Sequence, residues 1–302
     1  MLIYAWIPIT LTAAASQSVR NALQRHLKGR LSTNGAAFTR FVFGVPLAAI
    51  YLAALLAAGV GTVPATRPIF WVWVITASLA QIVATSLQIH VMAARNFATG
   101  VAYAKTEVVQ AAIFEIVFLG AVVTGRGAGG IVLATFAVMI MSLVKTAHPL
   151  RALFLGWTER TALIGLLAGT CFGVAAVGFR GAAVSLQDSS PWVAAAFTLV
   201  VSTTIQTLVM GSYLAVAERR ELRQVIRHAP TGALVGLASF IGSAGWFTAF
   251  TLQIAAYVRT LGLVELLFTL AISLYAFRER PSRAELVGLA LLGVSIMLVL
   301  NQ

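Results

Sequence analysis

The sequence has few charged residues and a single cysteine. Only 10% of its 302 residues are charged and 60% are hydrophobic, whereas about 25% of the residues in a soluble domain are charged. This composition excludes a soluble globular protein. Cys171 has no second cysteine to form an intramolecular disulfide, and the four histidines are scattered, so we expect no metal site.

Motifs of the common catalytic families are also missing. The chain contains no Gly-x-Ser-x-Gly, His-Glu-x-x-His or Walker A pattern, and these patterns place the nucleophile, the metal ligands or the phosphate cradle of such enzymes. We therefore expect no enzymatic activity and no cofactor.

Long apolar runs make up most of the chain. A hydrocarbon core about 30 Å thick requires about 20 apolar residues per helix. Breaks at charged residues, prolines and glycines delimit ten segments, at 3–24, 34–57, 68–93, 99–122, 128–146, 161–182, 191–216, 231–252, 255–277 and 284–300. The sequence therefore predicts an all-α polytopic membrane protein with ten transmembrane helices, embedded in a lipid bilayer.

Short similarities relate the two halves of the chain. At nearly constant offset, residues 36–39 match 195–198, residues 102–106 match 256–260, and Arg20 aligns with Arg180. Each half contains five predicted helices, an odd number, so the second copy must enter the membrane upside down. We expect repeat domains over 1–148 and 149–302, forming the inverted repeat that is associated with alternating-access transporters.

The net charge of +12 is distributed unevenly along the chain. Fourteen of the 21 basic residues lie in loops after the odd-numbered segments, whereas the loops after the even-numbered segments contain Arg67 and Arg126. Because basic loops stay in the cytoplasm, we predict that both termini lie outside it, in a cell membrane such as the bacterial inner membrane. Because these basic residues set the orientation in the membrane, we expect no nucleic-acid partner.

Eight ionisable residues fall inside the apolar segments, where a charge at a helix centre costs about 2.5–3.5 kcal/mol. They are Arg20, Arg40, Lys105, Arg180, Arg259, Glu107, Glu115 and Glu265. Arg40 lies about two turns from a predicted cytoplasmic end, so we expect its side chain to reach the interface. Arg259 and Glu265 are six residues apart, so we expect each to meet another helix or a cavity.

Polar and aromatic residues at helical spacing accompany these charges. One face of the first segment carries Gln17, Arg20 and Asn21, and such stripes line cavities or, alternatively, form hydrogen bonds between helices. We predict that the substrate-binding residues are Gln17, Arg20, Asn21, Gln81, Gln88, Tyr103, Lys105, Arg180, Trp246, Tyr257 and Arg259. Glu265, Glu107 and Glu115 are the candidate proton carriers, because a carboxyl group in a low-dielectric site can exchange protons near neutral pH.

Small residues at four-residue spacing occur in two segments. Gly165, Gly169 and Gly173 form one row, and Gly232 and Gly236 form another. Such rows let helix backbones approach closely. We therefore predict tight helix packing along both rows.

The last two segments carry motifs with a resemblance to a known family. Residues 262–269 read Gly-Leu-Val-Glu-Leu-Leu-Phe-Thr, and residues 277–282 read Phe-Arg-Glu-Arg-Pro-Ser, followed by Glu285, Gly288 and Gly293. Together with the repeat, they resemble the EamA-type branch of the drug/metabolite transporter superfamily. The resemblance implies secondary transport, often export of amino acids or other small metabolites, through a cavity lined by helices 1, 3, 4, 6, 8 and 9. Members commonly have a proline within helices 4 and 9, which this chain lacks.

The leading hypothesis is therefore a secondary active transporter that exports a small metabolite, such as an amino acid, by alternating access, with possible proton coupling. A multidrug exporter of lipophilic compounds and a non-transporting membrane scaffold are the alternatives. The partners expected are the small-molecule substrate and the bilayer, and the sequence leaves monomer and homodimer open.

Overall fold

The computed structural model describes residues 4–27, 31–93, 97–143, 159–268 and 282–301. Within these ranges the regular structure is helical, without strands. In the described part of the chain, seven helical stretches are long and apolar enough to cross a membrane. They are Thr33–Ala57, Pro68–Val91, Gly125–Ser142, Arg160–Val184, Pro191–Ala217, Ala229–Leu252 and Arg283–Leu300. The predicted all-helical, multi-pass membrane class is thereby confirmed.

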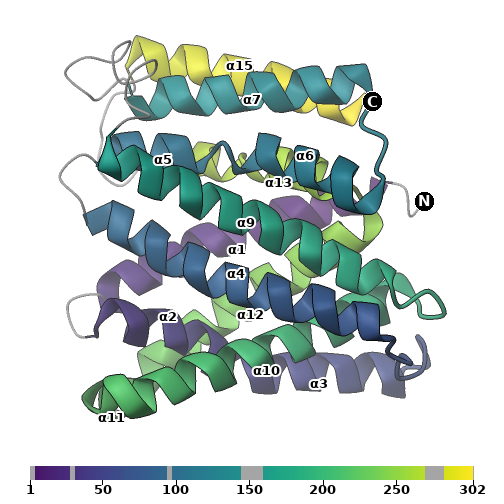
Figure 1. Ribbon diagram of the computed structural model, residues 1–302, viewed down its shortest axis with the longest axis vertical. Coiled ribbons are helices and arrows are strands. Elements are labelled where there is room, and N and C mark those ends of the chain that lie inside the picture. Colours follow the sequence, from purple (N-terminus) through teal and green to yellow (C-terminus); the bar gives the residue numbers. More distant parts are fainter. Residues whose placement is uncertain (1–3, 28–30, 94–96, 144–158, 269–281, 302) are drawn as a thin grey trace. The chain divides into compact units, whose positions relative to one another are not determined.

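The helices group into two compact units (Figure 1). Unit 1 comprises Met1–Ile82 and Gly178–Gln253, and unit 2 comprises Val83–Val177 and Ile254–Gln302. The helices are α1 (Trp6–Leu27), α2 (Thr33–Val42), α3 (Gly44–Ala57), α4 (Pro68–Ala93), α5 (Phe97–Ala104), α6 (Glu107–Leu119), α7 (Gly125–Leu143), α9 (Arg160–Val184), α10 (Pro191–Ala217), α11 (Arg219–Arg227), α12 (Ala229–Leu252), α13 (Ala255–Gly262) and α15 (Arg283–Leu300). Each unit therefore combines residues from both halves of the sequence.

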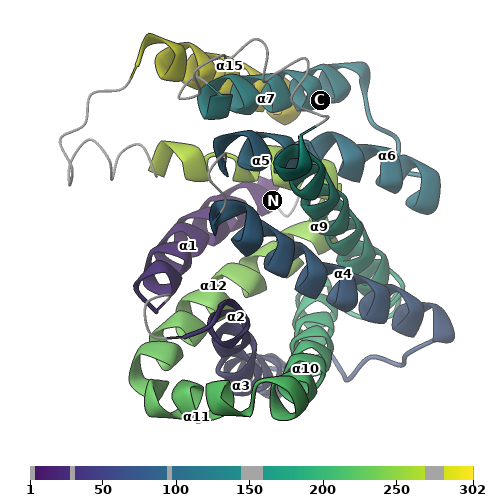
Figure 2. The same cartoon turned by 60° about the vertical axis from the view of Figure 1, so that its left-hand side comes forward.

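In unit 1, α1 packs along α12, while α2 and α3 contact both α10 and α12 (Figure 2). Where α4 meets the end of α9 and the start of α10, Phe70, Val74 and Leu186 form a buried cluster. Burying such side chains contributes about 1.5–3 kcal/mol each relative to full exposure. Apolar packing of this kind joins chain segments that are more than 100 residues apart.

The second predicted segment is interrupted at Phe43, between α2 and α3. A proline clashes with the carbonyl four residues before it and has no N–H to donate. For Pro46 that carbonyl belongs to Val42, the last residue of α2.

The Phe43 ring packs closely against Gly232 of α12. A Cβ added at Gly232 would lie only 2.6 Å from a carbon of this ring. The predicted close packing along the Gly232 row is confirmed, with Phe43 as the contacting residue.

In unit 2, α7 and α15 lie side by side, and α13 contacts α6, α7 and α15 (Figure 1). The glycine row of α9 faces the backbone of α5 and α6. A Cβ added at Gly165 would lie 2.1 Å from the carbonyl oxygen of Gly100, and one at Gly169 would lie 2.7 Å from that of Ala104. The close helix packing predicted from this row is therefore confirmed.

Two further predicted segments are not continuous helices. Segment 99–122 consists of α5, with 8 residues, and α6, with 13 residues. The described part of segment 255–277 consists of α13, with 8 residues, and the helical residues 265–268. Each piece is shorter than the roughly 20 residues that one straight span needs. The expectation of an uninterrupted helix in these two segments is thus corrected.

Candidate functional site

Both interrupted segments break in the same way. At the first break, the N–H of Thr106 donates to the carbonyl of Tyr103, and at the second the N–H of Val264 donates to that of Leu261. These bonds span three residues instead of four, so the helix tightens into a 3₁₀-type turn. Such turns inside a helix often mark functional hinges. No proline or glycine occurs between α5 and α6, where Lys105 and Thr106 form the turn.

Charged residues flank each of these turns in a regular order. Lys105 follows the last residue of α5, and Arg259 lies in the last turn of α13. Glu107 is the first residue of α6, and Glu265 begins the helical residues 265–268. Cations are stabilised at helix C-termini and carboxylates at helix N-termini. Each break therefore carries one cation and one carboxylate at favourable helix ends, two residues apart at the first break and six residues apart at the second.

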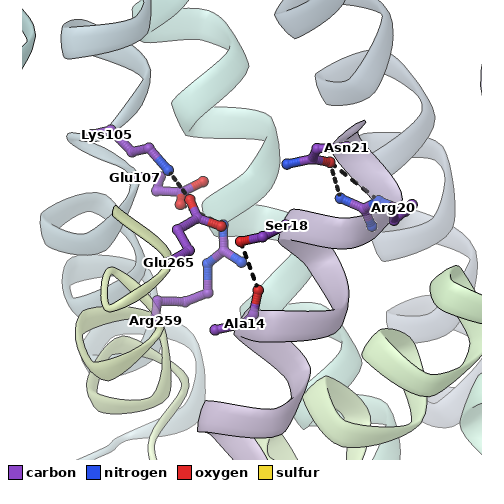
Figure 3. Close-up of polar contacts among 8 residues, drawn as sticks. All are labelled: Ala14, Ser18, Arg20, Asn21, Lys105, Glu107, Arg259 and Glu265. Carbon is purple, nitrogen blue, oxygen red and sulfur yellow. Dashed lines mark hydrogen bonds and ion pairs between the residues drawn. The ribbon is translucent and has the colours of Figure 1, made fainter. Parts of the chain in front are cut away.

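Two ion pairs join one break to the other (Figure 3). Lys105 Nζ lies 2.6 Å from Glu265 Oε1, and Arg259 Nη2 donates to Glu107 Oε1. The four side chains retain between 6% and 17% of their exposure. The expectation that Arg259 and Glu265 each meet another helix is confirmed. We name these four residues the charge quartet; its net formal charge is zero.

Glu115, the third predicted proton carrier, holds the start of α13. It is fully buried, and its two carboxylate oxygens accept the backbone N–H groups of Ala255 and Ala256 at 2.9 and 3.1 Å. The first N–H groups of a helix have no intrahelical acceptor. A carboxylate that accepts two of them caps the helix and complements its dipole.

The two predicted tyrosines of unit 2 are buried. Tyr257 has no exposed surface, and its hydroxyl accepts the backbone N–H of Thr124 at 3.1 Å, just before α7. A Cβ on Gly127 would lie 2.3 Å from this hydroxyl, so Tyr257 fills the contact between α13 and α7. Tyr103 is 7% exposed, and its carbonyl accepts the hydroxyl of Thr106 in the first turn.

The remaining predicted residues lie on several helices. On α1, Arg20 donates to Asn21 Oδ1 at 2.9 Å (Figure 3), and Gln17 is partly exposed. On α12, Trp246 is 8% exposed and stacks on Phe250. On α4, Gln88 is partly exposed in the portion that belongs to unit 2.

A polar contact between α4 and α10 contains residues that the stripe analysis missed. Gln206 Nε2 donates to Gln81 Oε1 at 2.7 Å, and Ser78 Oγ donates to Ser202 Oγ at 3.1 Å. Ser202 and Gln206 are four residues apart, so they share one face of α10. This spacing is the signal that could have identified both residues from the sequence.

Arg180 is bound to the end of α12. Its Nη1 donates to the carbonyl oxygens of Phe250 and Gln253, at 2.6 Å each. The last carbonyls of a helix have no intrahelical donor, and a cation also complements the negative end of the helix dipole. The structure therefore gives this predicted substrate-binding residue a helix-capping contact.

Arg180→Met is expected to lower the free energy of unfolding by about 2 kcal/mol, because it leaves two carbonyls without their charged donor. Arg180→Lys should recover part of the loss. Unfolding curves in detergent micelles measure both effects, and Arg67→Met, which removes an exposed arginine, is the matched control. An unfolding curve for Arg180→Met equal to that of the wild type would show that the cap is not needed.

Comparisons with known proteins identify the fold but no activity. No family model matches the chain, and no curated protein matches it. A solved structure, described only as the crystal structure of a protein, aligns with a TM-score of 0.68 at 16% identity. The alignment covers 98% of this chain and 97% of that chain. The chain therefore shares its fold with a protein of known structure over nearly its full length.

Proposed function

We propose that the protein is a secondary active transporter that exports a small zwitterionic metabolite, such as an amino acid, by alternating access. The observation that carries the proposal is the charge quartet at two interrupted apolar helices. Discontinuous membrane helices form the substrate and ion sites of many transporters. Ionisable residues inside membrane segments typically mark pathways for substrates or protons.

Stability alone does not account for the charge quartet. Well-packed apolar residues in place of a buried ion pair often leave stability unchanged or improve it by about 1–4 kcal/mol. Two such pairs at two helix breaks therefore contribute less to helix packing than apolar residues would. They can instead serve in ligand binding, because an incoming ligand can take the place of either partner.

The charges of the quartet match a zwitterion. Lys105 binds the carboxylate of the substrate, and Glu265 binds its ammonium group. The two ends of the substrate thereby replace the ion pair between Lys105 and Glu265. Protonation of Glu265 removes the acceptor for the ammonium group, so a proton and the substrate compete for one carboxylate. This competition couples proton entry to substrate export. Arg259 and Glu107 form the second pair and keep the site neutral.

The ten-segment, inverted-repeat architecture belongs to the same proposal. The matching breaks in segments 99–122 and 255–277 support it, because these segments correspond to each other in the predicted duplication. The resemblance to EamA-type transporters is a further support. The excess of basic residues in alternate loops supports an orientation with both termini outside the cytoplasm.

The two alternatives fit the quartet less well. A lipophilic cation that replaced Lys105 on Glu265 would leave the buried Lys105 ammonium without a partner, whereas a zwitterion binds both residues of the pair. A scaffold needs no ligand at all, so stabilisation by a metabolite separates it from a transporter.

The test begins with purified wild-type protein and a set of amino acids and related zwitterions. A ligand that raises the unfolding temperature is then assayed in proteoliposomes with and without a pH gradient. We expect transport that depends on the gradient, and we expect Glu265→Gln to abolish this dependence. Glu159→Gln, which neutralises an exposed carboxylate, is the matched control.

Two outcomes would count against the proposal. Transport by Glu265→Gln with an unchanged pH dependence would remove its coupling role. Failure of every zwitterion to stabilise the wild type or to be transported by it would leave the scaffold hypothesis as the better one.

A further inference from the structure

A narrow polar pocket lies within unit 1, among α2, α3, α4, α10 and α12. Its polar lining consists of Arg40, Gln81, Thr203, Gln206, Ser239 and Ser243. The free space holds about one water-sized sphere, which is the minimum that one bound water requires. All of these residues belong to unit 1, so the pocket is separate from the charge quartet.

Arg40 brings a buried positive charge to this pocket. The residue is only 9% exposed, so the structure corrects the expectation that its side chain reaches the interface. Its guanidinium lies 4.9 Å from the centroid of the Phe41 ring. Among the described residues of unit 1, no carboxylate forms an ion pair with Arg40.

Two acidic residues of unit 1 bind the start of α2, the helix that carries Arg40. Glu218 accepts from Ser32 Oγ and Asn34 Nδ2, and Glu221 accepts from the backbone N–H of Ser32. Both therefore bind the start of α2, while Arg40 lies in its last turn. Arg20 adds to the positive potential at Arg40. A buried guanidinium in such a field requires an anion for full compensation.

Ser239 supplies an unused hydrogen-bond donor to the same pocket. The residue is 3% exposed, and its Oγ has no hydrogen-bond partner. A serine within a helix can donate to the carbonyl four residues earlier, as Ser18 does to Ala14. A buried hydroxyl that forgoes this bond carries a desolvation cost. The cost is recovered when a ligand accepts a hydrogen bond from this hydroxyl.

We propose that this pocket binds a small monovalent anionic group, either a chloride ion or the carboxylate of a small organic acid. The Arg40 guanidinium supplies the charge, and the Ser239 hydroxyl supplies a second donor. The anion compensates the buried arginine and holds α2 against α12. The site is distinct from the transport site proposed for unit 2, so an experiment can refute one proposal without affecting the other.

The test uses the purified full-length protein in detergent, with sodium methanesulfonate as the large anion that keeps ionic strength constant. Sodium chloride, sodium bromide and sodium formate are titrated in separate arms while the unfolding temperature is recorded. We expect a saturable rise in at least one arm. A rise with chloride and bromide identifies a halide site, and a rise with formate alone identifies a carboxylate site.

Variants locate the effect in the pocket. Arg40→Gln is expected to abolish the saturable rise, whereas Arg67→Gln, which removes an exposed charge, keeps it. Ser239→Ala is expected to weaken the apparent affinity about tenfold, as for one hydrogen bond to a charged group. Without added anion, Ser239→Ala should unfold at or above the wild-type temperature, because the variant removes a buried hydroxyl that has no hydrogen-bond partner.

If Arg40→Gln does not fold, Ser239→Ala still tests the proposal. A wild type without a saturable response overturns the proposal, as does a response that Ser239→Ala leaves unchanged. Bromide anomalous scattering from crystals grown in sodium bromide gives an independent measurement. A peak within hydrogen-bonding distance of Arg40 supports a halide site.

Discussion

Glu265→Gln is expected to lower the free energy of unfolding by about 3 kcal/mol, because removing one partner of a buried ion pair leaves the other charge uncompensated. Lys105 and Arg259 would then share one carboxylate, that of Glu107. Lys105→Met is expected to cost a similar amount, since it leaves Glu107 and Glu265 with one base. Equilibrium unfolding in mixed micelles measures both values.

The double variant Lys105→Met/Glu265→Gln distinguishes a coupled pair from two separate effects. It removes one charge of each sign and keeps the quartet neutral, so we expect most of the lost stability to return. Glu159→Gln serves as the control for losing a carboxylate outside the quartet. If the two single losses simply add in the double variant, Lys105 and Glu265 do not act as a pair.

Glu115→Ala is expected to cost about 3 kcal/mol, because two buried backbone N–H groups lose a charged acceptor together. Glu115→Gln should cost less, since its amide oxygen can still accept one of them. Hydrogen exchange followed by mass spectrometry should show faster exchange at Ala255 and Ala256. Unfolding curves of the same variants give the energetic cost.

The same pair of variants separates capping from proton transport. If Glu115 acts as a cap, Glu115→Gln retains a pH-dependent transport activity once the protein is folded. If exchange at Ala255 and Ala256 is unchanged in Glu115→Ala, the capping role is refuted. Glu159→Ala is the control for a change in global stability.

The starts of α10 and α15, at Pro191 and Arg283, lie within one residue of the predicted segments 191–216 and 284–300. Ser190 accepts the N–H of Val193 ahead of Pro191, and Ser282 forms a capping box with Glu285. Both signals are readable from a few neighbouring residues. The breaks at Lys105–Thr106 and Leu263–Val264 were missed because neither segment contains a proline, the strongest marker of an interruption, and the single Gly262 beside the second break is a weak signal by itself.

The candidate site was predicted in part. Each of the four quartet residues was singled out because a charge in an apolar segment needs a partner. Which base meets which acid was not predictable, since Lys105 and Glu265 are 160 residues apart. The capping role of Glu115 was not predictable either, because the N–H groups that it accepts lie at the start of another helix.

The sequence by itself determined the membrane class, the positions of most helices and the residues whose charge must be compensated. These properties depend on apolar content and periodicity, which are local along the chain. Only the tertiary structure decided the partners: Glu265 for Lys105, two carbonyls of the α12 end for Arg180, and a polar pocket for Arg40. Partnership depends on how helices distant in sequence pack against each other, and one chain's composition does not specify that packing.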